Sequence, residues 1–253
     1  MLGLVARVQP RDIDLLLDLH DKRVLTTHQI ADLFFGSARS ARGRLLLLYR
    51  CGLVERFRPR LDSGSAPAHY LLGRAGAEIV AARLAVDLRE VYDKDRAVKL
   101  AYSPFLAHLV AVNTFYSRLA RAGRAAGLEV EWWGEVRTRR RWGSLVSPDG
   151  FGRVATPDSR RVFLELDLGT EPLRRLSAKL AAYDMVAGTE GAAELLLFCF
   201  HSPLRETNAR KLLHPVGLPI ATTHFALHTT DALGAIWLPL GAEARCSLLE
   251  LPI

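Results

Sequence analysis

Hydrophobic positions in the first third of the chain recur at helical spacing and then fall into two short strand-like stretches. Ile13, Leu16 and Leu17 share one helical face, and Gly52 follows a later helical segment at the place where helices commonly end. Three helices are predicted: one over residues 11–21, one that starts at a Thr26 or Thr27 cap and runs through Phe35, and one over 38–51. They are followed by a hairpin of strands at 53–60 and 69–72 and by a closing helix over 74–86. Three helices followed by a hairpin is the order of a winged helix-turn-helix.

The rest of the chain has a long helical pattern followed by strands that alternate with helices. Residues 87–127 are predicted to form a helical connector. The later elements are strands at 128–133, 162–168, 195–200, 220–226 and 235–238, with helices at 172–187 and 203–213. Because strands and helices alternate, an α/β sandwich is expected after the connector. The predicted domains are therefore 1–86, 87–127 and 128–253, and the fold class is α/β, or α+β overall.

Composition excludes several classes of protein. The 253 residues are 49% hydrophobic and 24% charged, which is typical of globular chains and not of disordered or collagen-like ones. The longest apolar runs, at 45–49 and 195–200, are far shorter than the roughly 18 residues that span a bilayer. A cytoplasmic protein without a membrane partner is expected. The three cysteines include no Cys-x-x-Cys pair, so buried free thiols are expected and a structural zinc site is not.

Charge is unevenly distributed along the chain. Residues 1–85 hold 13 basic and 8 acidic groups and residues 86–148 hold 11 and 7, whereas residues 149–253 hold 10 and 12. A basic first half in a chain of formal net charge +7 is typical of a protein that binds a polyanion. A solvated basic surface without a partner is the alternative.

Arginines are concentrated in the third predicted helix and the hairpin. Between Gly36 and Arg60 there are seven arginines and one acid. The predicted helix turns Leu45, Leu48 and Tyr49 inward and its arginines outward. In a winged helix this helix enters the major groove of double-stranded DNA and the hairpin touches phosphates. The candidate DNA-binding residues are Arg39, Ser40 and Arg42 for base edges, Arg44 on the same helix, and Arg56, Arg58 and Arg60 for the backbone. A solubilising face or a protein-interaction module would show the same pattern.

Two acids lie close together in a strand of the second half. Glu165 and Asp167 point to one face of the predicted strand, about 6 to 7 Å apart along the chain. Like charges at that separation resist burial unless a cation or a proton offsets them. Mg²⁺, which prefers carboxylate oxygens and water, is the expected partner, with Mn²⁺ as a substitute.

The order of these acids resembles the PD-(D/E)xK nuclease superfamily. Pro148-Asp149 precedes Glu165-x-Asp167, although Asp167 stands where that superfamily has lysine. Arg175, Lys179 and Tyr183 recur every four residues on the following helix, so they share a face. Lys179-x-x-x-Tyr183 resembles the Gln-x-x-x-Tyr helix motif of the RecB-like branch. Glu135, at the end of the first predicted strand, is a candidate further acid.

The whole combination resembles the replication-relaxation family of plasmid and mobile-element proteins over about residues 11–215. The resemblance rests on the predicted winged helix, a helix bearing His108 and Asn113, Trp132-Trp133-Gly134-Glu135, and the acidic and lysine motifs. It implies a restriction-endonuclease-like α/β sandwich and a role in plasmid replication or DNA processing. The implied partners are double-stranded DNA, replication or mobilisation proteins and a second copy of the chain in a homodimer.

Two functions follow from these motifs. In a Mg²⁺-dependent nickase or endonuclease, Asp149 and Glu165 would hold the metal, Asp167 would be a third ligand or the general base, and Lys179 would stabilise the developing negative charge. In a non-catalytic DNA-binding adaptor or regulator, the acids would be structural, paired with Arg174, Arg175 or the arginines of 137–141. There is no Walker loop and no dinucleotide motif.

Overall fold

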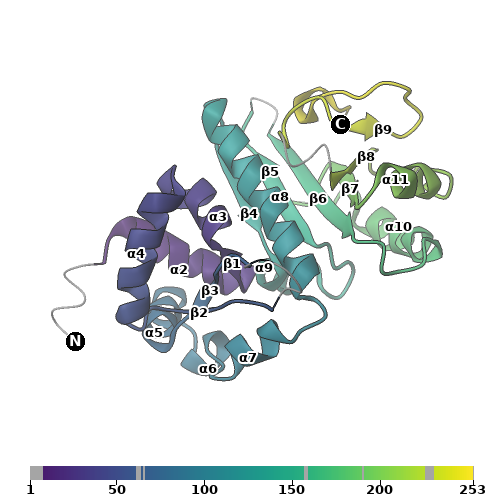
Figure 1. Ribbon diagram of the computed structural model, residues 1–253. Helices are drawn as coiled ribbons and strands as arrows, with labels where there is room; N and C mark the ends of the chain where they lie inside the picture. The colour runs from purple at the N-terminus through teal and green to yellow at the C-terminus, as the bar shows by residue number, and fades with distance from the viewer. Residues whose placement is uncertain are drawn as a thin grey trace. The chain divides into compact units, whose positions relative to one another are not determined.

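The computed structural model describes residues 8–60, 64, 66–156, 159–189, 191–225 and 231–252 (Figure 1). The chain divides into two compact units, Met1–Asn113 and Thr114–Ile253, and helix α8 (Leu106–Ala125) contributes its two halves to different units. Each unit has its own sheet, so the predicted mixture of α and β structure is confirmed. The three predicted domain bounds stay a prediction. None of the described helices has the length and hydropathy that crossing a membrane requires.

The first unit contains helices packed around a small antiparallel sheet. The sheet has the order β1-β3-β2. The short strand β1 was not predicted, because two residues are too few to show a period of two. The elements are α2 (Pro10–Lys22), β1 (Leu25–Thr26), α3 (Thr27–Ile30), the π-helical segment η1 (Ala31–Phe35), α4 (Ala38–Arg50), β2 (Val54–Phe57), β3 (His69–Leu72), α5 (Arg74–Leu84), α6 (Leu88–Val91), α7 (Arg96–Ala101) and the first half of α8.

Capping residues fix where the helices of the first unit begin. The hydroxyl of Thr26 accepts a hydrogen bond from the Gln29 backbone N–H, and the Gln29 side chain accepts one from the Thr26 N–H at 2.8 Å. This is a reciprocal capping box. At α4 the cap is a single bond, in which the Ser37 hydroxyl accepts a hydrogen bond from the Ser40 N–H at 3.2 Å. Gly36, with φ of 68°, makes the turn between η1 and α4, a conformation that other residues adopt at a cost. These caps confirm the predicted starts of both helices.

The second unit is built on a six-stranded mixed sheet of order β4-β5-β6-β7-β8-β9. Strands β4, β5 and β6 are antiparallel, β6, β7 and β8 are parallel, and β9 is antiparallel to β8. The elements are β4 (Val130–Trp133), α9 (Glu135–Trp142), β5 (Gly150–Val154), β6 (Arg160–Asp167), α10 (Arg174–Val186), β7 (Leu195–Phe200), α11 (Pro203–Arg210), β8 (Ile220–His224), β9 (Leu238–Pro239) and the 3-10 turn η2 (Leu248–Glu250).

One face of this sheet is covered by the second half of α8, which lies over the strands in Figure 1. Trp132 stacks on Tyr116 with ring centroids 5.8 Å apart and also contacts Phe115. The neighbouring strand makes room for its indole with two glycines: a Cβ at Gly150 or Gly152 would lie within 2.9 Å of Trp132 atoms. The glycines therefore let a large ring lie flat on the sheet.

The opposite face carries the side chains of α9, α10 and α11. A chain of aromatic contacts runs across it, with centroid separations from 4.9 to 5.4 Å. Its members are Trp142, Phe151, Phe163 and Tyr183. Because side chains alternate along a strand, Glu165 and Asp167 lie on the same face of β6 as Phe163. The predicted acidic pair therefore faces α10 and α11.

Some predicted elements were wrong or displaced. The segment 150–154, which contains two glycines, forms β5 and was not predicted as a strand, and α9 was also missed. The strand predicted at 235–238 is shifted to Leu238–Pro239, and residue 226 of another predicted strand lies outside the described residues. The cysteines are free as predicted, but only Cys199 is fully buried, while Cys51 and Cys246 are half-buried.

Candidate functional site

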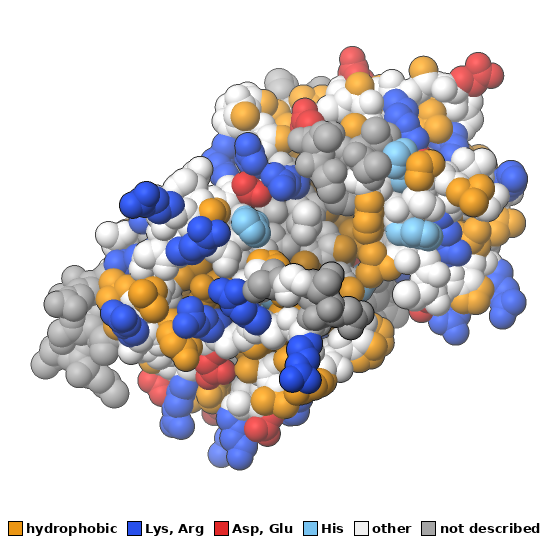
Figure 2. Space-filling view, viewed as in Figure 1, with side chains coloured by type: hydrophobic (Ala, Val, Ile, Leu, Met, Phe, Trp, Pro, Cys, Tyr) orange, Lys and Arg blue, Asp and Glu red, His pale blue; other side chains and the backbone are white. Residues whose placement is uncertain are grey.

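The outer side of α4 forms a basic surface in the first unit. Ala41, Leu45 and Leu48 are buried and hold the helix against the core. Figure 2 shows Lys and Arg side chains gathered over the region that Figure 1 labels α4. Tyr49, predicted to pack inward, is instead 41% exposed, because its position borders the buried stripe. We call the exposed side chains of this helix the α4 face; they belong to Arg39, Ser40, Arg42, Leu46, Tyr49 and Arg50.

Arg44 has a different environment from the other arginines of α4. Its side chain is 16% exposed, and its Nε donates to the carboxylate of Asp12 at 2.9 Å, with a second bond from its terminal nitrogen. Asp12 is fully buried in α2. Arg44 therefore joins α4 to α2 and does not lie on the outer surface predicted for it.

The hairpin adds arginines next to the α4 face. Arg56 lies over the Tyr49 ring, with its guanidinium carbon 4.6 Å from the ring centroid. This contact ties the exposed part of β2 to the end of α4. Arg58 and Arg60, which follow β2, are exposed. All three arginines that were predicted to contact the DNA backbone therefore belong to the surface segment that adjoins α4.

Glu165 is the centre of the acidic site in the second unit. Its side chain is buried on β6, and one of its oxygens accepts a hydrogen bond from Lys179 Nζ at 2.5 Å. The Tyr183 hydroxyl donates to the other oxygen. Lys179 and Tyr183 come from successive turns of α10, as their four-residue spacing predicted. Sequence reasoning thus found this pair, although the direct contact with Glu165 depends on how α10 packs on β6.

Asp149 adds a second negative charge to this site. Its Oδ2 accepts a hydrogen bond from the Leu166 backbone N–H at 2.8 Å, next to Glu165. Burial, followed by the charge of Asp149, raises the pKa of Glu165 to about 7, although Lys179 and Tyr183 act in the opposite direction. Burial acts to lower the pKa of Lys179, but Glu165 outweighs it and the net direction is upward. Asp149, Glu165, Lys179 and Tyr183 therefore form one electrostatic cluster.

Asp167 has its own cation. Arg205, on α11, donates to Asp167 Oδ2 from Nε at 3.2 Å and from a terminal nitrogen at 2.9 Å. The other carboxylate oxygen accepts the Gly169 N–H. Of the partners suggested from sequence, Arg175 pairs with Glu171, Arg139 with Glu135 and Arg137 with Glu131. Sequence reasoning missed Arg205, because 38 residues separate it from Asp167 and no local motif links them.

Glu135 and Asn113 have partners outside the cluster around Glu165. Glu135 is the first residue of α9, not the end of a strand, and its carboxylate pairs with Arg139 one turn later at 2.7 Å. Asn113, buried in α8, donates to the backbone oxygens of Lys22 and Val24 in the first unit. Asn113 therefore supports the packing of that unit.

The acids as they lie do not fit a resident Mg²⁺. Within the described residues, no three His, Cys, Asp or Glu side chains come together as a metal-binding group. Both oxygens of Glu165 and both of Asp167 accept hydrogen bonds from protein donors. Mg²⁺ would need such oxygens at about 2.1 Å in near-octahedral geometry. Mg²⁺, or Mn²⁺ in its place, stays a prediction that comes from the acidic motif and the resemblance.

Comparison with known proteins gives a match to a family model. Neither the curated proteins nor the solved structures include one that matches the chain. A family model described as replication-relaxation matches residues 16–195, a span that includes α4, the hairpin, and the whole cluster around Glu165. Because that span is well over half of the 253 residues, the chain belongs to the replication-relaxation family.

Proposed function

We propose that this chain binds double-stranded DNA through the α4 face during plasmid replication or mobilisation, and that it does so as an adaptor that does not itself cut DNA. The observation that carries the proposal is the exposure of Arg39, Arg42 and Arg50 on one side of a helix whose other side is buried. Membership of the replication-relaxation family supports a DNA-related role.

The α4 face has the features of a helix that enters the major groove. Arg39, Ser40 and Arg42 lie in its first turns, where a groove-binding helix reaches base edges. Arg50 and the hairpin arginines extend the positive surface toward the position of the phosphates. In the sequence from Gly36 to Arg60 the one acid is Glu55, so little negative charge opposes a polyanion. The order of three helices and a hairpin supports a winged-helix mode of binding.

The occupied carboxylates favour the adaptor over the nickase. Lys179 and Tyr183 donate hydrogen bonds to Glu165, and Arg205 donates to Asp167, so the oxygens of these two acids are already occupied by the chain's own groups. A nuclease of this type needs the same oxygens for its metal. In the adaptor, these contacts serve to fix α10 and α11 against the sheet.

The first prediction concerns duplex binding. Arg39→Ala with Arg42→Ala is expected to weaken binding of a labelled duplex, because two charge-assisted contacts are lost. Arg56→Ala with Arg58→Ala is expected to reduce the slope of log affinity against log salt by about 2, at about 0.9 per phosphate contact. Fluorescence anisotropy over a salt series measures both effects.

A matched control separates contact from net charge. Arg83→Ala with Lys94→Ala also removes two positive charges, but from exposed positions in α5 and in the turn between α6 and α7. This control is expected to retain most of the wild-type affinity and salt slope. Equal losses in the control and in the Arg39/Arg42 variant would mean that the α4 face is not the DNA-binding surface.

The second prediction concerns cleavage. Supercoiled plasmid incubated with the protein is expected to stay supercoiled with Mg²⁺, with Mn²⁺ and with EDTA, because Lys179 and Tyr183 occupy Glu165. Gel electrophoresis gives the readout. Open-circle or linear DNA that forms with either metal, and is lost with EDTA and in Glu165→Gln, would refute the adaptor and establish the metal-dependent nickase instead.

A further inference from the structure

Helix α9 presents arginines on the surface of the second unit. Thr138 and Trp142 are buried and hold this helix against the sheet. From residue 136 to residue 148 the sequence has four arginines and no acidic residue. All four are exposed, and we call them the α9 arginines: Arg137, Arg139, Arg140 and Arg141. The helix therefore carries a local excess of positive charge on its outer side.

Three of the α9 arginines share one side of the helix. Arg140 and Arg141 follow Arg137 at distances of three and four residues along the chain. Residues at these spacings are neighbours on a helix surface, and like charges placed there destabilise the helix. A ligand that carries several negative charges in a row would relieve this repulsion.

The acids that pair with this helix form exposed ion pairs. Glu135 accepts from Arg139 at 2.7 Å, and Glu131 accepts from Arg137 at 3.0 Å. The four side chains are between 31% and 68% exposed. Exposed pairs contribute little to stability, because water and salt screen them. A phosphate can therefore take the place of a carboxylate at these arginines at little cost.

One of these carboxylates also acts on an arginine of the sheet. Glu131 on β4 lies directly opposite Arg153 on β5, and Arg153 is exposed. Burial acts to raise the pKa of Glu131, but hydrogen bonds and the charges of Arg137 and Arg153 outweigh it, and the net direction is downward. Two arginines thus act on one carboxylate, and the positive surface continues from α9 onto the sheet.

Arg137 is held in place by an aromatic ring. Its guanidinium carbon lies 4.4 Å from the centroid of the Trp133 ring. Trp133 in turn stacks on the buried Trp142, with ring centroids 5.4 Å apart. Because a guanidinium is planar and already oriented here, it loses little conformational freedom when it forms further hydrogen bonds. The first arginine of the row is therefore pre-organised.

We infer that the α9 arginines and Arg153 form a second DNA-binding surface, which contacts the phosphate backbone of double-stranded DNA without reading its sequence. A guanidinium binds phosphate oxygens through two parallel hydrogen bonds, and a duplex supplies phosphates at regular intervals. An acidic protein would need a row of carboxylates with a matching spacing.

The ligand of this surface rests on the proposed function, because membership of the replication-relaxation family supports a role with DNA. Its residues, however, belong to the second unit, and none of them is part of the α4 face. Variants of the two surfaces can therefore be measured separately.

The test uses the full chain and a labelled duplex in an anisotropy titration over a salt series. Arg140→Ala with Arg141→Ala is expected to reduce the slope of log affinity against log salt by about 1.8, at about 0.9 per phosphate contact. Between about 50 and 200 mM salt, this variant should then lose about tenfold less affinity than the wild type loses. The reduction should be equal for two duplexes of unrelated sequence, because phosphate contacts carry no sequence information directly.

A conservative variant separates charge from a structural role of the two guanidinium groups. Arg140→Lys with Arg141→Lys keeps both positive charges and should keep most of the wild-type slope. A slope that falls as far in this variant as in the alanine variant would overturn the inference, because loss of the guanidinium contacts within the protein would then explain both results.

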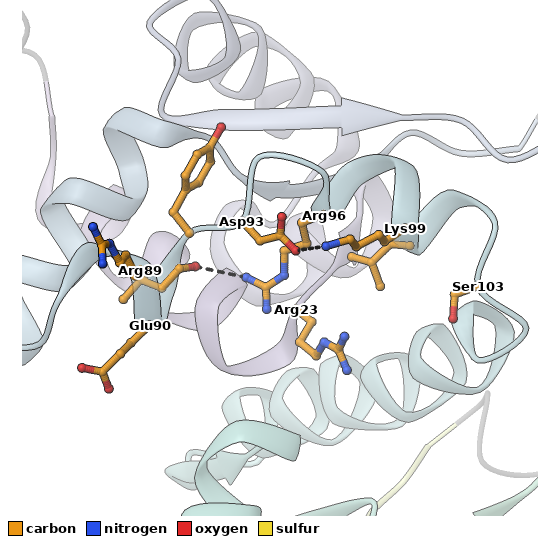
Figure 3. A pocket seen from close by; sticks show the side chains of 10 residues that line it. Arg23, Arg89, Glu90, Asp93, Arg96, Lys99 and Ser103 are labelled. Carbon is orange, nitrogen blue, oxygen red and sulfur yellow. Dashed lines mark hydrogen bonds and ion pairs between the residues drawn. The ribbon is translucent and has the colours of Figure 1, made fainter.

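Two further variants control for net charge. Arg174→Ala with Lys211→Ala removes two positive charges from exposed positions at the start of α10 and just after α11. Arg89→Ala with Lys99→Ala removes two from the lining of a pocket in the first unit, where Figure 3 shows Lys99 paired with Asp93. Both variants should retain the wild-type slope. Equal reductions in these controls and in the alanine variant of α9 would overturn the inference.

The outcomes separate this inference from the proposed function. A wild-type slope in the alanine variant of α9, together with weakened binding by the α4-face variant, would overturn the inference and leave the proposed function standing. A reduced slope in the alanine variant of α9, together with unchanged binding by the α4-face variant, would support the second surface and overturn the first.

Discussion

Between about pH 5 and pH 8, the free energy of unfolding of the protein is expected to fall by about 2 to 3 kcal/mol relative to that of Glu165→Gln. The reason is that folding raises the pKa of Glu165 from its ordinary 4.5 to about 7. The folded state then holds a proton that the unfolded state releases. The stabilisation is fully present below about pH 4.5 and is lost as the pH rises through about 7. Chemical denaturation at a series of pH values measures it.

The contribution of Glu165 is the difference in unfolding free energy between the wild type and Glu165→Gln at each pH, because other titrating groups affect both proteins alike. Glu171→Gln changes an exposed carboxylate that precedes α10 and is expected to keep the wild-type pH dependence. Asp149→Asn should reduce the loss, because the charge of Asp149 contributes to raising the pKa of Glu165. A difference between wild type and Glu165→Gln that is flat over this range would show that Glu165 is ionised throughout. The acidic cluster would then be more open to a cation than its contacts indicate.

Asp12→Ala is expected to lower the free energy of unfolding by about 3 kcal/mol or more. The substitution leaves the Arg44 guanidinium, which is 16% exposed, without its buried carboxylate. It also removes the acceptor for the Gln9 N–H at the start of α2. Both losses act on the α2–α4 contact, so the basic α4 face would lose its support. Urea denaturation monitored by circular dichroism gives the measurement.

The control is an ion pair of the same unit that is open to solvent. Arg74 and Glu78 are 72% and 47% exposed, so Glu78→Ala is expected to cost less than about 1 kcal/mol. If Asp12→Ala costs no more than Glu78→Ala, Arg44 must find another partner or turn to solvent. It would then become available to DNA, as the sequence first suggested.

Periodicity and capping signals predicted most elements because those signals are local. Thr26, Ser37 and Gly36 lie within a few residues of the groups they cap or turn, so the starts of α3 and α4 could be placed from sequence. Strand β5 was missed for the opposite reason. Its glycines resemble a turn in sequence, yet they exist to accommodate Trp132 from the neighbouring strand. A signal that depends on a neighbouring strand cannot be recognised along one segment.

For the basic and acidic sites, too, some features follow from local signals in the sequence and others do not. Because side chains alternate along a strand, Glu165 and Asp167 share a face of β6. Because residues four apart lie on one side of a helix, Lys179 and Tyr183 share a face of α10. Likewise, the buried stripe of α4 determines that Arg39 and Arg42 are exposed. These are properties of one helix or strand and follow from its repeat.

The partners of these side chains were decided only by tertiary packing. Arg44 borders the buried stripe of α4, and Asp12, 32 residues earlier, decides that it faces inward. Arg205 reaches Asp167 because parallel strands β6 and β7 bring α11 to the end of β6. Asp149 acts on Glu165 across two antiparallel strands. The sequence alone thus determined which charged groups share a face of one helix or strand. Long-range packing decided which of them pair with one another, because electrostatic pairing depends on distance in space and not along the chain.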